Sequence, residues 1–192
     1  MLQRTLLIAF LAAALVLPAA DTPKFTKSGE LLFPAGYRSW VFLSSGLGMT
    51  YGPNARRAAD APRFTNVFVN PSAHREFLKT GHWQEGATFV LEIRNSSSEG
   101  SINKGGHFQS GIAAIEVEVK DTKRFPSGWA YYDFADKPKP SVAALGAQAT
   151  CPACHTANGA VESTFVQFYP SLIDVAKAKG TLKAAFAGAK GH

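Results

Sequence analysis

The sequence predicts a single α+β domain that is mainly β: an antiparallel sheet with a few short helices and a C-terminal helical segment. Five segments have strand-like patterns, and only one short helix lies among them. More helical sequence begins only after Ala143. The chain has 192 residues, 46% of them hydrophobic, which suits one core and is short for two full domains. We therefore assign residues 21–192 to one domain.

The first two strands are expected at Ser39–Leu43 and Phe64–Val69. The first is a short apolar run, and the second alternates between two sets of side chains, as a strand does. Between them, Gly46–Pro62 is rich in glycine, proline, asparagine and aspartate. This composition predicts a loop.

A short helix is expected over Ser72–Thr80. Asn70 is a favoured N-cap residue, and Pro71 suits the first helical position. Gly81 favours the left-handed backbone that ends a helix. The sheet is therefore interrupted by one helix between its second and third strands.

Three more strands are expected at Thr88–Arg94, Ile112–Lys120 and Gly128–Phe134. Ile112–Lys120 alternates apolar and charged residues, the pattern of a half-buried strand. The polar stretch Ser96–Gly106 is typical of a hairpin connection. The two prolines of Lys137–Ser141 separate the sheet from a last segment that is too short for a core of its own.

Residues 1–20 have the layout of a secretory signal peptide. Arg4 precedes an apolar stretch over Leu6–Leu17, and Ala19 and Ala20 lie just before a polar turn at Asp21. The apolar stretch is shorter than the roughly 20 residues of a membrane span, so cleavage after Ala19 or Ala20 is favoured over an uncleaved anchor. We expect a periplasmic protein without a membrane span after cleavage.

The charge pattern argues against nucleic-acid binding. The formal net charge is +6, but the basic residues are scattered along the chain. The densest groups, Arg56–Arg57 and Lys120 with Lys123 and Arg124, are too small for a nucleic-acid groove. A mildly basic surface fits solubility and weak attraction to acidic partners.

The chemistry of the chain is concentrated in the CxxCH motif from Cys151 to His155, which is a c-type haem attachment signal. Two thiols three positions apart can each add to one vinyl group of the porphyrin, and the adjacent imidazole is then held under the iron. The motif predicts one covalently attached haem c, bound through Cys151 and Cys154, with His155 as the proximal ligand of the iron.

Other functions of the cysteine pair fit less well. A thioredoxin-like dithiol lies early in its fold, whereas Cys151 follows the antiparallel pattern. A disulfide across so small a loop would gain little unfolded-state entropy. A zinc site lacks two further ligands at suitable spacing.

The sixth ligand of the iron decides the function. Met49 is the one methionine left after cleavage, and an axial methionine is usual in electron-transfer cytochromes c. The remaining histidines are more typical of surface or structural roles; they are His74, His82, His107 and His192. An open or weakly filled sixth position is the simplest hypothesis, and a strong ligand such as Met49 or His107 would indicate electron transfer.

A series of ordered stretches extends beyond the haem motif, roughly from Tyr37 to Leu172. They are Tyr37–Val41, Phe64–Val69, Leu78–Gly81, Gly106–Gln109, Val117–Asp121, Arg124–Pro126 with Gly128–Ala130, Cys151–His155 and Thr164–Pro170. In these stretches the sequence resembles the cytochrome P-460 family of bacterial periplasmic monohaem proteins, which includes the cytochromes c′-beta. The resemblance implies a mainly antiparallel β fold and a homodimer.

The resemblance implies one of two activities. Members whose haem is cross-linked to a lysine oxidise hydroxylamine, and for this chain that activity would imply a soluble cytochrome as electron acceptor. The cytochromes c′-beta lack the cross-link and bind nitric oxide and similar gases in an apolar pocket. The counterpart of that lysine is expected near Leu91, in the lysine-free strand Thr88–Arg94. Lys79 and Lys104 are possible substitutes, although both positions are typical of solvated lysines.

Further candidates follow from the same resemblance. Four phenylalanines are candidates for an apolar distal wall or for ordinary core: Phe42, Phe68, Phe89 and Phe108. Glu116 is a candidate proton-transfer carboxylate, although its alternation with Val117 predicts a solvent-facing side chain unless that face of the sheet is the haem face. Arg38 is a candidate contact of a bound ligand or a haem propionate, with a structural ion pair as the alternative.

We therefore expect a haem c protein that binds nitric oxide or a related small nitrogen ligand at an open iron site. The alternatives are a hydroxylamine-oxidising haem enzyme and an electron-transfer cytochrome c.

Overall fold

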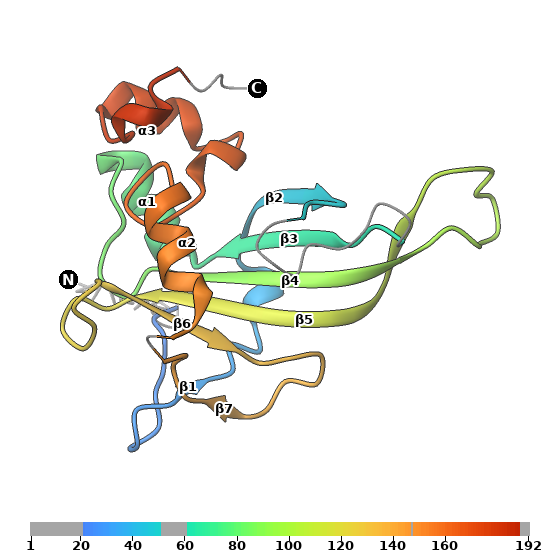
Figure 1. Ribbon diagram of the computed structural model, residues 1–192, viewed down its shortest axis with the longest axis horizontal. Helices are drawn as coiled ribbons and strands as arrows, with labels where there is room; N and C mark the ends of the chain where they lie inside the picture. Colours follow the sequence, from blue (N-terminus) through green and yellow to red (C-terminus); the bar gives the residue numbers. More distant parts are fainter. Residues whose placement is uncertain (1–20, 51–60, 147, 189–192) are drawn as a thin grey trace, which may run out of the picture.

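The computed structural model describes residues 21–50, 61–146 and 148–188 (Figure 1). It confirms the mainly β fold: a five-stranded antiparallel sheet in the order β2-β3-β4-β5-β6, and a separate two-stranded sheet of β1 and β7. The signal peptide predicted for residues 1–20 lies outside the described residues. Within the described ranges, no helix combines the length and the apolar character that crossing a membrane requires.

The elements follow one another in the predicted order. The strands are β1 (Leu31–Leu32), β2 (Val41–Leu47), β3 (Phe64–Val69), β4 (Thr88–Ser97), β5 (Phe108–Lys120), β6 (Trp129–Asp133) and β7 (Ser141–Val142). The α-helices are α1 (Pro71–Thr80), α2 (Thr150–Asn158) and α3 (Ile173–Lys179). Short 3₁₀ helices lie at Tyr37–Ser39, Val166–Phe168 and Ala184–Phe186.

The first predicted strand, Ser39–Leu43, is wrong at both ends. Ser39 closes a 3₁₀ turn, so β2 begins only at Val41. It then continues to Leu47, where it pairs with Phe64 at the start of β3, so the predicted loop from Gly46 begins too early. Residues 51–60 of that loop lie outside the described residues.

Strands β4 and β5 are longer than predicted and form a hairpin that extends beyond the rest of the sheet (Figure 1). Their pairing continues from Arg94 to the pair of Ser97 and Phe108. The side chains there are largely polar, so no hydrophobic alternation marks these residues as strand. Their backbone N–H and C=O groups nevertheless pair in the antiparallel ladder.

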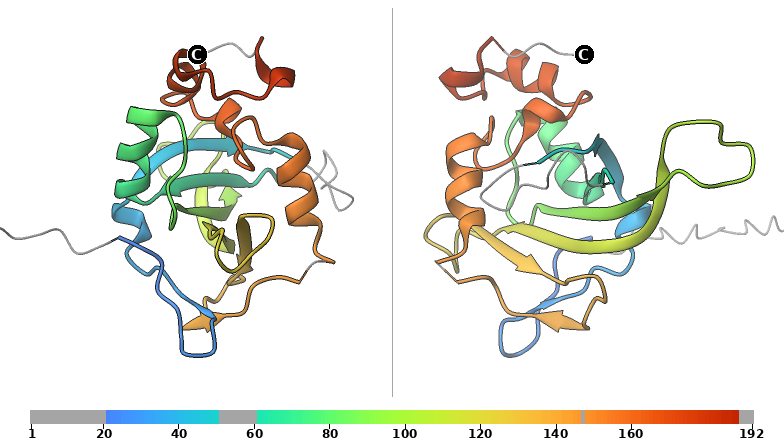
Figure 2. Two further views of the ribbon diagram at one scale, coloured as in Figure 1. Left: turned by 90° about the vertical axis from the view of Figure 1, so that its left-hand side faces the viewer. Right: turned by 45° about the vertical axis from the view of Figure 1, so that its right-hand side comes forward.

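Both faces of the large sheet are covered by hydrophobic residues. The first core lies beneath the helices and includes Leu43, Val69, Phe77, Trp83, Phe89, Trp129, Tyr131, Val161, Tyr169, Leu172 and Ile173. The second core lies on the opposite face and includes Leu31, Tyr37, Val90, Ile115, Val117, Val119, Tyr132 and Phe134. Figure 2 shows α2 beside the sheet and α1 and α3 together at one end of it.

Helix α1 has the predicted boundaries but an unexpected cap. Asn70 and Gly81 flank it, and Gly81 has the left-handed φ of 74°. The Asn70 side chain instead accepts a hydrogen bond from the Thr88 backbone N–H over 2.8 Å. The cap comes from Asp21, whose Oδ2 accepts a hydrogen bond from the Ser72 backbone N–H over 2.6 Å.

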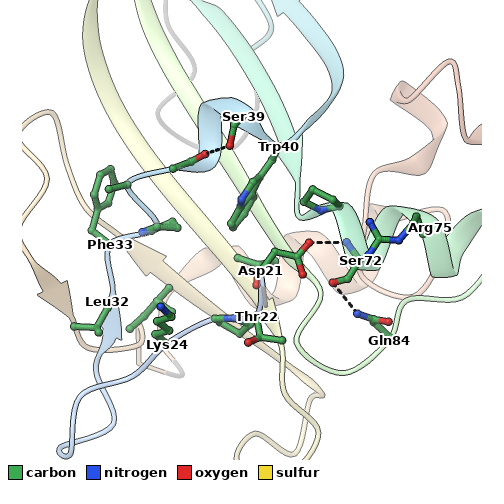
Figure 3. A pocket seen from close by; sticks show the side chains of 17 residues that line it. Asp21, Thr22, Lys24, Leu32, Phe33, Ser39, Trp40, Ser72, Arg75 and Gln84 are labelled. Carbon is green, nitrogen blue, oxygen red and sulfur yellow. Dashed lines mark hydrogen bonds between the residues drawn. The ribbon is translucent and has the colours of Figure 1, made fainter. Parts of the chain in front are cut away.

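A groove of about 730 Å³ lies between the N-terminal segment and the start of α1 (Figure 3). Its walls include Asp21–Lys24, Leu31–Gly36, Trp40 and Arg75. None of the residues of the CxxCH motif lines it. The groove is therefore separate from the CxxCH motif.

Candidate functional site

Helix α2 carries the whole CxxCH motif. Cys151, Cys154 and His155 are at positions i, i+3 and i+4, which share one face of a helix. Both thiols are free and partly exposed. The helix lies against β6, and Cys151 packs against the first core (Figure 2). The motif is thus held against the face of the sheet that the helices cover.

The imidazole of His155 is fixed by two aromatic rings and by its Nδ1 atom. The ring centroids of Tyr131 and Phe165 lie 4.7 and 4.5 Å from that of His155. Nδ1 donates a hydrogen bond to the backbone carbonyl oxygen of Ser163 over 3.0 Å. This arrangement assigns the proton to Nδ1 and leaves Nε2 as the nitrogen with a lone pair for a metal.

A second acceptor, Glu118 on β5, lies beside the same nitrogen. Its Oε2 is 2.9 Å from Nδ1 of His155. This oxygen is shut off from solvent and accepts no hydrogen bond elsewhere in the described part of the chain. Burial alone would lower the pKa of His155, but the Glu118 carboxylate and the Ser163 carbonyl outweigh it and raise that pKa. The two acceptors, by their position, favour a proton on Nδ1.

Glu116 lies on the same face of β5 as Glu118, and its predicted solvent-facing orientation is wrong. In the ladder it stands opposite Leu91 of β4 and Asp133 of β6. Burial, followed by the Asp133 charge, raises the pKa of Glu116. Burial and then the Glu116 charge also raise the pKa of the Cys151 thiol. The charged face of this strand is turned toward the CxxCH motif.

Arg38 is not part of this arrangement. Its Nη2 lies 2.5 Å from Oε2 of Glu92, and its Nε donates to the same oxygen over 2.9 Å. Glu92 alternates with Leu91 along β4, so it projects from the opposite face of the sheet, on the side of Val90 and the second core. The structure thus shows the ion-pair alternative for Arg38.

Of the four candidate phenylalanines, Phe89 is the one that belongs to the core on the His155 side of the sheet. Phe89 packs edge-on against Trp83 and belongs to the first core. Phe68 packs against the second core, and Phe42, which contacts Phe68, is 53% exposed. Phe108 lies at the base of the hairpin tip and is also exposed.

The other candidate ligands and lysines do not contact His155 in the described ranges. Met49 is 44% exposed in the turn after β2. The exposed candidates also include His82, His107, Lys79 and Lys104. His74, on α1, is half-buried, and burial lowers its pKa. His192 lies outside the described residues.

Sequence reasoning missed Glu118 and Ser163. Glu118 had a signal, because it lies two positions from Glu116 and must share its face of the strand. Ser163 had none, because it acts through its backbone carbonyl, which every residue has. Its place near His155 is set by the turn from Gly159 to Thr164, in which Thr164 N–H donates to the Val161 carbonyl over 2.9 Å.

These residues fit a covalently held haem. Two free thiols and an imidazole share one helical face, and the imidazole is oriented through Nδ1. Among the described residues, no group of three His, Cys, Asp or Glu side chains is arranged to hold a metal ion by itself. A donor set of two thiols and one imidazole on a single helical face suits a porphyrin-bound iron with one protein imidazole.

Comparison with known protein families gives a match. A family model described as cytochrome P-460 matches residues 34–166, from just before the first 3₁₀ helix to just beyond the CxxCH motif. No curated protein matches the chain.

Proposed function

The chain belongs to the cytochrome P-460 family, and on this premise we propose that it is a periplasmic c-type monohaem protein that binds nitric oxide or a related small nitrogen ligand. Membership of the family implies haem binding. The covalent attachment, the single haem and the choice of ligand are our inference. They are supported by the CxxCH motif on α2 and by the side chains that face it.

The chain's own residues perform three tasks in this proposal. Cys151 and Cys154 form thioether bonds, and the Nε2 of His155 ligates the iron. The hydrogen bond from Nδ1 to the Ser163 carbonyl keeps the imidazole in one orientation and one tautomer. When bound, the haem supplies an iron whose position opposite His155 can accept a small ligand.

The observation that carries the choice of nitric oxide is Leu91. It stands on the covered face of the sheet, at the position where a cross-linking lysine is expected in the hydroxylamine-oxidising members, and its side chain is apolar. Apolar walls favour nitric oxide, which needs no hydrogen-bond donor in order to bind iron.

Hydroxylamine oxidation is a second candidate because Glu116 lies on the same face. Oxidation of hydroxylamine releases protons, and a half-buried carboxyl group with a raised pKa is suited to accept one. Electron transfer is less favoured, because Met49 and His107 are both exposed. A homodimer and a soluble cytochrome partner remain proposals from the family.

The test is the intact mass and the visible spectrum of the protein matured in a periplasm with c-type haem attachment. We expect the mass of one haem, an ordinary ferrous c-type spectrum, a shift on adding nitric oxide, and no electron release from hydroxylamine to an added acceptor. Turnover of hydroxylamine together with a red-shifted ferrous band would overturn the binding proposal in favour of the enzyme. A low-spin ferric spectrum would favour electron transfer.

Two variants serve as controls for the attachment. Replacing both Cys151 and Cys154 by alanine should remove the haem mass after denaturation. Replacing exposed His107 by alanine should leave mass and spectrum unchanged. Haem that stays covalently bound without both thiols would contradict the proposed attachment.

A further inference from the structure

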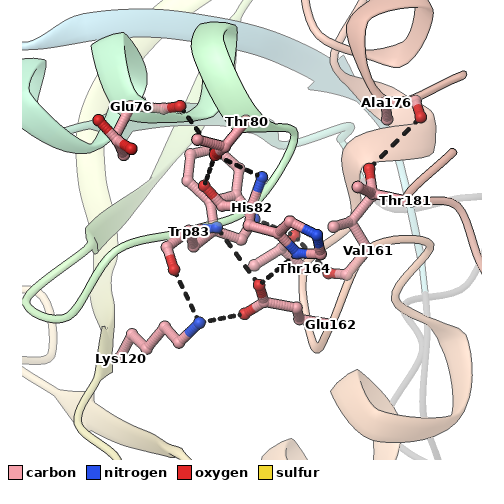
Figure 4. A network of polar contacts seen from close by, with 10 residues as sticks. All are labelled: Glu76, Thr80, His82, Trp83, Lys120, Val161, Glu162, Thr164, Ala176 and Thr181. Atoms are coloured by element: carbon pink, nitrogen blue, oxygen red, sulfur yellow. Dashed lines mark hydrogen bonds and ion pairs between the residues drawn. The ribbon is translucent and has the colours of Figure 1, made fainter. Parts of the chain in front are cut away.

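A partly buried ion pair links the end of β5 to the turn that follows α2 (Figure 4). The Nζ of Lys120 lies 2.8 Å from Oε2 of Glu162 and donates to the Trp83 backbone carbonyl over 2.7 Å. The other oxygen of Glu162 accepts a hydrogen bond from the Trp83 backbone N–H over 3.3 Å. The Lys120 and Glu162 side chains are only 17% and 22% exposed. We call this group of three residues the clasp.

The clasp holds a turn whose backbone is under constraint. Glu162 has a φ of +53°, which is costly for a residue other than glycine and persists where surrounding contacts enforce it. At Gly159, a Cβ atom would lie 2.7 Å from backbone atoms of Ser163 and Thr164. The Trp83 Nε1 also donates to Thr164 Oγ1 over 2.9 Å. The turn is thus closely packed and is fixed from outside through Trp83.

Ser163 is the residue between these two attachments, and its carbonyl is the acceptor of the His155 Nδ1 proton. Glu118 provides a second acceptor at 2.9 Å, and it lies on the same face of the same strand as Lys120. The N–H points at the neutral carbonyl, while the enclosed Glu118 oxygen has no hydrogen bond of its own in the described residues. Two acceptors therefore compete for one proton.

We propose that the clasp of Lys120, Glu162 and Trp83 is a positioning device. It keeps the Ser163 carbonyl as the hydrogen-bond acceptor of the His155 Nδ1–H and limits hydrogen bonding of that N–H to the Glu118 carboxylate. The inference rests on the proposed function, because it assigns His155 to the iron. A carboxylate acceptor makes a ligating imidazole more basic than a carbonyl does. The choice of acceptor thereby tunes the electron density at the iron.

The test uses the haem-loaded protein and two variants, Lys120→Met and Glu162→Ala. In both, the turn is released and the His155 proton moves toward Glu118. We expect the reduction potential to become more negative and the iron–histidine stretching frequency of the ferrous protein to rise. In a Glu118→Gln background both shifts should be lost, and Lys120→Arg should restore most of the wild-type values.

The direction of the shifts separates positioning from a simple charge effect. Removing Lys120 takes away a positive charge and removing Glu162 a negative one, so a through-space effect would move the potential in opposite directions. Opposite shifts, or no shift in either variant, would overturn the proposal. Lys123→Met, which removes an exposed lysine from the turn after β5, is the matched control and should change neither value.

Two further readouts keep the outcomes distinct. The intact mass and the nitric oxide spectrum report on the proposed function, so a protein without attached haem refutes that function and not the clasp. If Lys120→Met does not fold, Glu162→Ala and Lys120→Arg decide: a more negative potential in the first and a near wild-type potential in the second support the clasp, and any other pair of results contradicts it.

Discussion

Leu91 of β4 stands directly opposite Glu116 of β5 in the antiparallel ladder. Side chains at directly opposed positions share a face of the sheet and lie within contact distance. An apolar residue and a carboxyl group whose pKa is raised by burial are therefore neighbours on the face that carries Phe89 and Glu118. This pair contains both the position where a cross-link is expected in related enzymes and a candidate proton acceptor.

Leu91→Lys should introduce a third covalent attachment to the haem. The substitution places an amine on the covered face beside the Glu116 carboxylate, which can take up the proton that the amine must lose before it reacts. The new bond joins the amine nitrogen to a porphyrin carbon that loses its hydrogen, so an added two-electron oxidant such as hydrogen peroxide must take up the two electrons. After haem attachment and this treatment, proteolysis and mass spectrometry should find the peptide with residue 91 joined to the haem peptide of Cys151. The ferrous band should shift to the red.

Ile93→Lys is the matched control for this substitution. Ile93 lies on the same strand and the same face, two residues farther along the hairpin. No cross-link is expected there. If Leu91→Lys forms no bond to the haem, or if both variants bond to it equally, position 91 is not the counterpart of the cross-linking lysine.

Glu116→Gln should stabilise the protein at neutral pH, by about 1 kcal/mol, the common size of a single-substitution effect. Because the folded-state pKa of Glu116 is raised by burial, the native protein binds this proton more tightly than the unfolded chain does. The stability that Glu116 contributes is present below the unfolded pKa of about 4.3 and is lost as the pH rises through the folded pKa. The advantage of glutamine is thus largest at neutral pH.

The measurement is urea unfolding of both proteins between pH 4 and pH 8. Their difference should shrink as the pH falls. The exposed hairpin residue Glu99, changed to glutamine, provides a control that should show no such trend. A Glu116→Gln protein that is less stable at pH 7 would show that the carboxylate has a partner that favours its charged form.

The sheet was largely predictable because its central strands have strong local patterns. β3 has the predicted bounds, whereas the hairpin ends of β4 and β5 are held by backbone pairing among polar residues such as Ser96 and Ser97. Alternation in β5 identified two faces but could not show which one faces solvent. Much of the layer that covers the first core comes from residues after Ala143, and local periodicity does not encode where that segment packs.

The part of the site formed by residues close together in the sequence was predictable. The spacing of Cys151, Cys154 and His155 is local, and one helix positions all three. The acceptors of the His155 proton were not predictable in this way. Glu118 reaches the ring from a strand 37 positions earlier, and Ser163 contributes only a backbone carbonyl, so both depend on tertiary packing.

Glu92→Gln should destabilise the fold by about 3 kcal/mol, because breaking a buried ion pair leaves its partners without compensation. Glu92 is 3% exposed and accepts hydrogen bonds from Tyr37, Arg38 and Arg94. Equilibrium unfolding in urea measures the loss. Arg38→Met should cost less, because the Arg38 side chain is 55% exposed. The nitric oxide spectrum of both variants should be unchanged, since this network lies on the other face of the sheet.

The same network should make the protein sensitive to acid. Burial alone would raise the pKa of Glu92, but its hydrogen bonds outweigh burial and lower that pKa. A lowered pKa contributes stability above the unfolded value of about 4.3, and this stability is lost as the pH falls through the folded pKa. Wild type should therefore lose stability below about pH 4.3 more steeply than Glu92→Gln does. Parallel curves would contradict this role.

Asp21→Ala should lower the free energy of unfolding by about 1 kcal/mol through loss of the α1 cap. The Asp21 carboxylate accepts the Ser72 N–H, and its backbone carbonyl accepts a hydrogen bond from the Asn70 side chain. Urea unfolding of the processed protein measures the effect. Thr22→Ala, in the next residue, should be nearly neutral.

Asp21→Asn separates the hydrogen bond from the charge. An asparagine oxygen can still accept the Ser72 N–H, but it lacks the negative charge that interacts favourably with the N-terminal end of the α1 dipole. The asparagine variant should therefore be intermediate between wild type and alanine at low salt and approach wild type at high salt, where the charge is screened. Equal losses in the asparagine and alanine variants at every salt concentration would show that the charge contributes the whole effect and the hydrogen bond none.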